Sequence, residues 1–312
     1  MPERALRVVL TTESYLPYLS GVTVSVDALA RGLGAAGHLV LVVAPRPADG
    51  REPDGVGSPG PEPAFAWLNS YQLPAVAPPA YRMAWPNPLD PAWRAATAFR
   101  PDVVHAHSPF VTGVLARRLA RASGAPLVFT HHTRFADYGH YLGPLAGPGA
   151  RLTDAYLRRW WAGCAAIIAP SADLAADIRA RMPAERSTRV HVVPTGIDVA
   201  RISGLQPIDP RPEAGWSADA VVVATLGRLA PEKSPDLILD AMAAVAAADP
   251  WARLIVIGGG PSETSLRVRA EQADLAGRVW FTGALPRLEA LARLRGADLF
   301  VFASRTETQG LV

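Results

Sequence analysis

Short apolar runs alternate with helix-patterned segments along almost the whole chain, and this alternation limits the fold more than any other feature. The runs are expected to be strands, because they are rich in β-branched residues and are bounded by glycine or proline. They are residues 6–10, 39–43, 102–105, 127–129, 166–168, 190–193, 220–226, 254–257, 279–281 and 299–302. Strands that alternate with helices predict parallel sheets with helices on both faces, so we expect an α/β fold.

The alternation is interrupted at residues 194–216, which contain several prolines and show little periodicity. Such a segment is typical of a linker. A length of 312 residues also suits two domains better than one. We therefore expect two doubly wound domains in tandem, residues 1–198 and 199–312. Residues 45–63, rich in proline and glycine, are expected to form a surface loop.

Composition excludes several classes of protein. Hydrophobic residues make up 49% of the chain and charged residues 19%, as in chains that form a core. The net charge of +3 is no evidence for nucleic acid, but it is compatible with anionic ligands or an anionic membrane surface. The single cysteine, Cys164, excludes an internal disulfide. Because no apolar run reaches the ~18–20 residues of a membrane span and no signal peptide precedes Arg7, we expect a cytoplasmic protein.

The first expected strand leads into a loop that ends at Ser20 and Gly21, where a helix begins. Ligands of open α/β sheets bind at the carboxyl ends of the strands. Gly21 would allow the backbone to approach a phosphate at this edge. The alternative is an ordinary helix N-terminus in which Ser20 is the cap.

Histidines follow two of the strands. His105 and His107 lie at one strand end, and His131 and His132 lie at another. No Asp or Glu accompanies them at ligand spacing, which argues against a metal site. His131 and His132 are adjacent, so they point to opposite faces if the strand continues. We expect one histidine of each pair to be structural, and a single histidine at a strand end to contact a substrate.

Two cations flank a turn that opens the first helix of the second domain. Arg228 and Lys233 both follow the strand at residues 220–226, a placement that favours a diphosphate clamp over a solvated turn. The glycines at 258–260 do not form a dinucleotide fingerprint, because that motif would need a glycine where Glu263 stands. No Asp-x-Asp motif occurs, so a leaving diphosphate would be stabilised by cations and helix ends without a metal.

The chain closes with a strand-like run, residues 298–304, followed by Glu307 and Gly310. The last residues are expected to start a helix. A glutamate and a glycine at a strand-to-helix turn can hold a polar, phosphate-bearing ligand.

Together these segments resemble glycosyltransferase family 4, the retaining GT-B enzymes, over nearly the whole chain. Residues 15–22, 132–141 and 306–310 look like those of diacylglycerol glucosyltransferases and GDP-mannose-dependent mannosyltransferases, and residues 194–198 match the family's domain hinge. The resemblance implies two Rossmann-like domains that face a cleft. It also implies a truncated second domain, since the family's partner glutamate would fall at position 315.

The resemblance also implies roles for individual residues. The residues implied to act in catalysis are His132, Glu307, Arg228 and Lys233. The residues implied to bind the donor are Gly21, Arg228, Lys233, Glu307 and Gly310. The residues expected on the acceptor side are Tyr15, His107 and Arg134.

The implied reaction is retaining transfer of a hexosyl group, glucose or mannose, from a nucleotide-diphosphate sugar to a lipid or glycan acceptor, without metal or other cofactor. Two alternatives stay open: a non-catalytic sugar-nucleotide-binding fragment, and a GT-B-fold epimerase that would use Glu13 as its carboxylate. A lipid acceptor would suit a peripheral position on the inner face of the membrane.

One helical segment is relevant to membrane binding. It carries Arg151, Arg158 and Arg159 together with Trp160 and Trp161. Basic residues and tryptophans on one helix can lie at a membrane interface. The alternative, which the spacing favours, is that the apolar residues at 152, 156 and 160 belong to the core.

Overall fold

The computed structural model describes residues 4–48, 50, 60–72, 81–85, 87, 89–134 and 146–310. The chain forms two compact units, Met1–Ile197 and Asp198–Gly310, here called unit 1 and unit 2. Some sequence expectations fall outside the described residues. They concern most of the loop at 45–63, residues 135–141 of the second family motif, and the last two residues.

Unit 1 is built on a seven-stranded sheet in which all neighbouring strands are parallel. In spatial order its strands are β3 (Ala64–Leu68), β2 (Leu39–Pro45), β1 (Arg7–Thr11), β6 (Val103–Ala106), β7 (Leu127–Thr130), β8 (Ala166–Ala169) and β9 (Val190–Val192). A separate antiparallel pair consists of β4 (Ser70–Tyr71) and β5 (Met83–Ala84). Strand β3 was not predicted from the sequence, because none of its residues, Ala-Phe-Ala-Trp-Leu, is β-branched.

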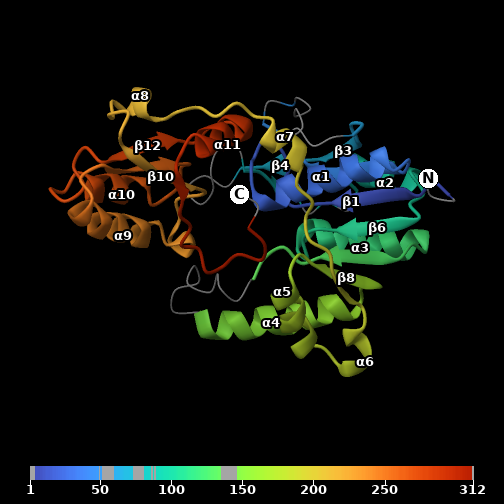
Figure 1. Ribbon diagram of the computed structural model, residues 1–312. Coiled ribbons are helices and arrows are strands. Elements are labelled where there is room, and N and C mark those ends of the chain that lie inside the picture. Colours follow the sequence, from blue (N-terminus) through green and yellow to red (C-terminus); the bar gives the residue numbers. More distant parts are fainter. Residues whose placement is uncertain are drawn as a thin grey trace. The chain divides into compact units, whose positions relative to one another are not determined.

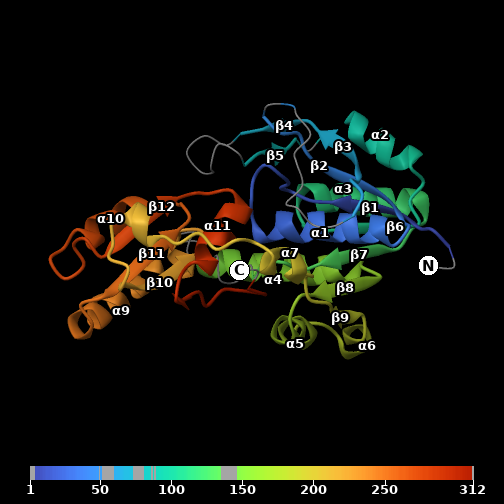
Figure 2. The same ribbon diagram turned by 45° about the horizontal axis from the view of Figure 1, so that its top comes forward.

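Helices lie on both faces of this sheet (Figures 1 and 2). They are α1 (Gly21–Ala35), α2 (Pro91–Ala98), α3 (Val111–Ser123), α4 (Ala146–Ala162), α5 (Ala172–Ala180) and α6 (Ala184–Ser187). On one face, α1 packs through Val26 against Leu10. On the other face, α3 packs through Leu115 into a core that includes Val9. Because successive residues of β1 point to opposite faces, the single strand contributes to both cores.

Unit 2 repeats this design on a smaller scale. Its parallel strands lie in the order β12 (Val279–Gly283), β11 (Ala252–Ile257), β10 (Val221–Leu226) and β13 (Leu299–Phe300). Its α-helices are α7 (Val199–Ser203), α8 (Arg211–Ala214), α9 (Pro235–Ala248), α10 (Glu263–Ala270) and α11 (Arg287–Arg295), with one 3-10 turn, η2 (Pro231–Lys233). Leu239 of α9 and Leu266 of α10 share one core, whereas Ala290 of α11 lies in a second core.

Within the segment at 194–216, the short helices α7 and α8 form. One local expectation for unit 2 needs correction. The strand-like run at 298–304 pairs only over Leu299–Phe300, followed by one further bond in which Val301 N donates to Ala224 O at 2.9 Å. The described residues after this point, 302–310, form neither helix nor strand.

The strand order fixes where a ligand can be held in each unit. In unit 1 the chain first extends the sheet from β1 to β2 and β3 and then returns to place β6 on the other side of β1. In unit 2 it extends from β10 to β11 and β12 and then places β13 on the other side of β10. Open α/β sheets bind ligands at the carboxyl ends of the two strands where the order reverses. The strand order therefore predicts ligand binding at the loops after β1 and β6 in unit 1, and after β10 and β13 in unit 2.

Candidate functional site

Three histidines form a connected group at the carboxyl ends of β6 and β7. His107 Nδ1 lies 2.8 Å from His132 Nε2, a hydrogen bond in which one ring donates and the other accepts. The ring of His105 stacks on that of His107 with centroids 4.3 Å apart. His105 Nε2 in turn lies 2.7 Å from Thr130 Oγ1. His107 and His105 are buried, whereas His132 is partly exposed, so His132 is the member of the group that a ligand can reach.

Burial keeps these rings neutral at physiological pH. Desolvation lowers the pKa of His132 to about 4 and that of His105 to about 3. It also lowers the pKa of His107 well below its ordinary value. In a neutral imidazole one ring nitrogen donates and the other accepts, so a hydrogen bond at one nitrogen fixes whether the other is a donor or an acceptor. A neutral His132 ring can form a hydrogen bond but not an ion pair.

His131 occupies a different environment from His132, although the two are adjacent. Its side chain is only 4% exposed and lies edge-on against the rings of Phe129 and Trp161. Burial lowers the pKa of His131 to about 3. Within the ranges that the structure describes, no group of three or more His, Cys, Asp or Glu side chains is placed to hold a metal ion.

Glu13, in the loop after β1, reaches the start of α3. Its Oε1 accepts hydrogen bonds from Thr112 N at 2.8 Å, Thr112 Oγ1 at 3.2 Å and Ser108 Oγ at 3.3 Å. Phe110 occupies the N-cap position of α3 and makes no side-chain cap bond, so Glu13 supplies the missing acceptor from 99 residues away. Burial raises the pKa of this carboxyl, and the bonds from Thr112 and Ser108 oppose that shift.

The roles of Ser108 and Thr112 were missed in the sequence. The sequence does contain one signal for them, the apolar Phe110 at the N-cap position of α3. A helix that lacks a local cap needs a hydrogen-bond acceptor from elsewhere in the chain. The structure also shows that Glu13 is engaged with α3, an arrangement that leaves little support for the epimerase alternative.

Tyr15, expected on the acceptor side, lies in the core of unit 1. It is 4% exposed, and its ring centroid lies 5.5 Å from that of Phe65. Its hydroxyl donates to Asp27 Oδ1 at 2.9 Å, and Asp27 also pairs with Arg31 at 3.2 Å. Burial and the Asp27 carboxylate both raise the pKa of the Tyr15 phenol. These contacts give Tyr15 a structural role in holding the loop after β1 against α1.

Two other predicted residues of unit 1 are also engaged locally. Ser20 is the N-cap of α1, where Thr23 N donates to Ser20 Oγ at 3.2 Å and Ser20 N donates to Thr23 Oγ1 at 2.8 Å. This capping box places Gly21 at the first helical position, so the ordinary cap is present. Arg134 forms an ion pair with Asp173 in the first turn of α5.

In unit 2, a direct ion pair joins the loops after β10 and β13. Lys233 Nζ donates to Glu307 Oε1 at 2.5 Å, across 74 residues of sequence. A second bond runs in parallel, because Thr306 Oγ1 donates to the backbone oxygen of Glu232 at 3.1 Å. Lys233 and Glu307 are both partly exposed. The pair therefore forms a polar surface at the point where the order of the sheet reverses.

Arg228 follows β10 and Gly310 follows β13, and both make fewer contacts than Lys233 and Glu307 do. The guanidinium of Arg228 lies 3.9 Å from the carboxylate of Glu232, and the Arg228 side chain is 43% exposed. Gly310 is exposed, and a Cβ added there would meet nothing within 4 Å.

The glycine-rich turn after β11 packs against the loop after β10, which carries Arg228. A Cβ on Gly260 would lie 2.3 Å from the backbone oxygen of Leu229, and one on Gly258, at φ +130, would lie 2.0 Å from that of Gly227. Leu229 N also donates to Gly259 O at 3.0 Å. Gly258 and Gly260 therefore permit a close approach to the loop that carries Arg228, a physical reason for glycine at these two positions that does not require a ligand.

The two tryptophans of α4 were weighed above between a membrane interface and the core, and the structure places them in the core. Trp160 and Trp161 are 2% and 1% exposed and belong to the core of unit 1, so neither can lie in a membrane interface. Leu152, expected in the core, is instead 73% exposed. Among the helices that the structure describes, none has the length and apolarity needed to span a bilayer.

Solved structures share the architecture of this chain. Sucrose-phosphate synthase from Thermosynechococcus elongatus matches with a TM-score of 0.69 at 18% identity, covering 97% of this chain and 77% of that one. WaaG, a glycosyltransferase involved in lipopolysaccharide biosynthesis, matches with a TM-score of 0.63 at 18% identity, covering 97% and 76%. The fold is that of the GT-B glycosyltransferases, as expected from the sequence.

Family models place the chain within this class. The model for Glycosyltransferase Family 4 matches residues 19–201, and that for Glycosyl transferases group 1 matches residues 209–312. The chain belongs to glycosyltransferase family 4 and is a hexosyltransferase, which confirms the resemblance seen in its sequence motifs.

Curated relatives extend over nearly the whole chain. Alpha-monoglucosyldiacylglycerol synthase of Streptococcus pneumoniae is 27% identical over 98% of this chain and 68% of its own length. GDP-mannose-dependent alpha-mannosyltransferase of Mycolicibacterium smegmatis is 31% identical over 97% of this chain and 75% of its own length.

Proposed function

We propose that this hexosyltransferase moves glucose or mannose from a nucleotide-diphosphate sugar to a lipid or glycan acceptor, with retention at the anomeric carbon. The observation that carries the proposal is the pair of Lys233 and Glu307 at the carboxyl ends of β10 and β13. A nucleotide sugar presents a diphosphate next to a hydroxyl-rich ring, and a cation beside a carboxylate complements those two parts.

On unit 2, Lys233 and Arg228 would hold the diphosphate and stabilise its charge as it leaves. Glu307 would accept hydrogen bonds from sugar hydroxyls, and Gly310 would lie beside the diphosphate. Because two cations are available for a developing charge, the proposed reaction needs no metal and no cofactor besides the donor.

On unit 1, His132 would hydrogen-bond a hydroxyl of the transferred sugar. Its low pKa supports this role, since a neutral ring suits a neutral partner. Gly21 would face the diphosphate through its backbone, and Arg134 would serve the acceptor side. We assign Tyr15 and His107 supporting roles, because both are buried and engaged with other side chains.

The proposed acceptor is a lipid of the diacylglycerol type. The support comes from relatives, since the names of two of them, from Streptococcus pneumoniae and Acholeplasma laidlawii, state synthesis of monoglucosyldiacylglycerol. A lipid acceptor would bring the enzyme to the inner membrane surface from the cytoplasmic side.

The test is transfer by the full chain from radiolabelled UDP-glucose and GDP-mannose to diacylglycerol in mixed micelles, with and without EDTA. The expected product is an α-glycoside, identified by NMR of its anomeric proton, in equal yield with EDTA. A β-glycoside would refute retention, and loss of product with EDTA would refute the metal-free mechanism. Binding of the donor without any product would favour the non-catalytic alternative.

A further inference from the structure

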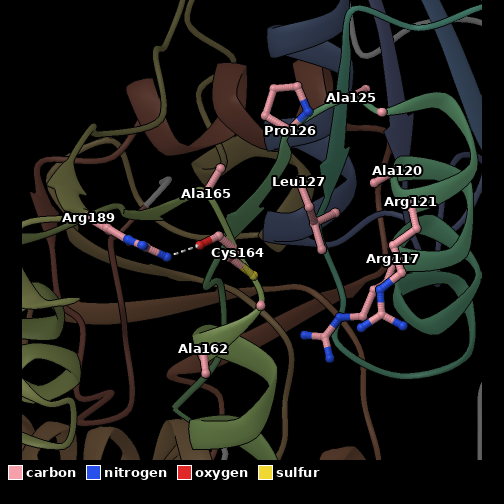
Figure 3. A pocket seen from close by; sticks show the side chains of 12 residues that line it. Arg117, Ala120, Arg121, Ala125, Pro126, Leu127, Ala162, Cys164, Ala165 and Arg189 are labelled. Carbon is pink, nitrogen blue, oxygen red and sulfur yellow. Dashed lines mark hydrogen bonds between the residues drawn. The ribbon is translucent and has the colours of Figure 1, made fainter.

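Unit 1 has a hollow of about 600 Å³ at the edge of its sheet that is remote from the histidine group (Figure 3). It is formed by the end of α3, the segment before β7, the end of α4 and the segment before β8, together with Arg189, which directly precedes β9. These segments lie at the amino ends of parallel strands. His107 and His132 follow the carboxyl ends of β6 and β7, so the hollow is separate from the proposed transfer site.

The hollow carries three positive charges and no negative one. Its charged lining residues are Arg117, Arg121 and Arg189, and its other lining residues include no Asp or Glu. Arg117 and Arg121 are four residues apart on α3 and extend from the same face, whereas Arg189 lies across the hollow (Figure 3). In the described part of the chain, none of the three forms an ion pair with a carboxylate.

Backbone contacts hold two of these arginines in place. Arg117 Nη2 donates to Trp160 O at 2.5 Å, and its guanidinium lies 4.1 Å from the ring centroid of Trp160. Arg189 Nη1 donates to Cys164 O at 3.2 Å, the bond drawn in Figure 3. Carbonyl oxygens orient a guanidinium group but do not cancel its charge, so the positive potential of the hollow persists.

Arg117 also keeps an unused donor. Its Nε is buried and has no hydrogen-bond acceptor among the residues described. The room for this side chain depends on Gly163, where an added Cβ would lie 3.0 Å from the guanidinium carbon. A buried donor without an acceptor carries a free-energy cost.

We propose that this hollow binds a phosphate-bearing anion, such as a phosphate monoester or diester. Guanidinium groups match phosphate oxygens in charge and in geometry, and three of them line this hollow. The other walls are small or apolar, with Ala120, Pro126 and Leu127 among them, which suits an uncharged group attached to the phosphate. The volume lies within the range of small-molecule sites. The headgroup of an anionic lipid and a free phosphate compound share this chemistry.

The test compares two double variants of the full chain that change the charge equally. Arg121→Gln/Arg189→Gln removes two cations of the hollow, while Arg94→Gln/Arg118→Gln removes two exposed cations of α2 and α3 that do not line it. Soluble probes are pyrophosphate and glycerol 3-phosphate, measured by calorimetry at low salt. The lipid probe is a phosphatidylcholine vesicle with or without phosphatidylglycerol, measured by co-sedimentation.

We expect the hollow variant to lose at least about tenfold in affinity for one kind of probe, while the control binds as the wild type does. A loss confined to the phosphatidylglycerol vesicles identifies a lipid headgroup, and a loss for the soluble probes identifies a free phosphate compound. The proposal is overturned if neither probe binds, or if both double variants lose affinity equally, because the effect would then be one of net charge. Sugar transfer is not measured, so the result stands apart from the proposed function.

Discussion

The ammonium group of Lys233 lies 2.5 Å from the carboxylate of Glu307, and this pair joins the loops after β10 and β13 of unit 2. Lys233 is also the only lysine in the sequence. Unit 1 contains a related contact, in which Glu13 joins the loop after β1 to the start of α3 beyond β6. In both units a carboxylate connects the two loops at which the sheet order reverses.

Replacing Lys233 by Ala should lower kcat/KM for the nucleotide sugar by about 100- to 1000-fold, because the proposed diphosphate clamp would lose one of its two cations. Steady-state transfer assays measure this change. Lys233→Arg should restore part of the activity, since the charge is kept. Arg94→Ala, on the exposed surface of α2, is the matched control and should leave the rate unchanged. Wild-type turnover by Lys233→Ala would refute the clamp.

The uniqueness of Lys233 allows a direct test of donor binding. An amine-reactive ester should modify two positions in the chain, Lys233 and the α-amino group. A nucleoside diphosphate at ten times its Kd should slow labelling of Lys233 about tenfold, because a bound site is protected in proportion to its occupancy. Peptide mass spectrometry separates the two positions, and the α-amino group is the internal control. Equal labelling of Lys233 with and without nucleotide would contradict its place in the donor site.

The buried histidines should make unit 1 less stable as the pH falls. The unfolded chain has histidine pKa values near 6.5, whereas the folded values are about 3 for His105 and His131 and about 4 for His132. Between pH 6.5 and 4 the unfolded chain binds more protons, so the unfolding free energy falls as pH falls. Each histidine contributes up to about 1.4 kcal/mol per pH unit.

Urea denaturation from pH 7 to pH 4.5 measures this dependence. His131→Phe should keep the packing against Phe129 and Trp161 and should reduce the slope of unfolding free energy against pH. An unchanged slope in this variant would show that His131 takes up its proton in the folded state.

Removing the Glu13 side chain should weaken the first turn of α3. Glu13→Ala should cost about 1–2 kcal/mol, the usual value of an N-cap contact, and should speed amide exchange at Thr112. Glu13→Gln keeps an oxygen acceptor and should lie between Ala and wild type. Hydrogen exchange of the α3 peptide measures both. Unaltered exchange at Thr112 in Glu13→Ala would mean that the cap contributes nothing.

Tyr15→Phe separates a structural role from an acceptor contact. The variant loses the bond to Asp27, and we expect a loss of about 1–2 kcal/mol in the unfolding free energy of unit 1. The KM for the acceptor should stay at the wild-type value. A raised acceptor KM with unchanged stability would restore the role inferred from the sequence.

Much of the fold could be predicted because its signals are local. The β-branched runs of β1, β2 and β10 and the breaks around them identify parallel strands without any knowledge of partners. β3 could not be found in this way, because its residues lack that bias and its position comes from pairing with β2. β13 is shorter than its apolar run, since only two of its residues meet β10.

The sequence by itself determined the α/β class, the two-part organisation and the strand ends at which polar residues gather, because periodicity and strand-end position are properties of neighbouring residues. Only the tertiary structure decided which of these residues are buried and which are open to solvent. It placed Tyr15 in a core and His131 against Trp161, and it left His132 partly exposed. Such contacts join residues tens of positions apart, so they depend on sheet order and burial, which no local pattern encodes.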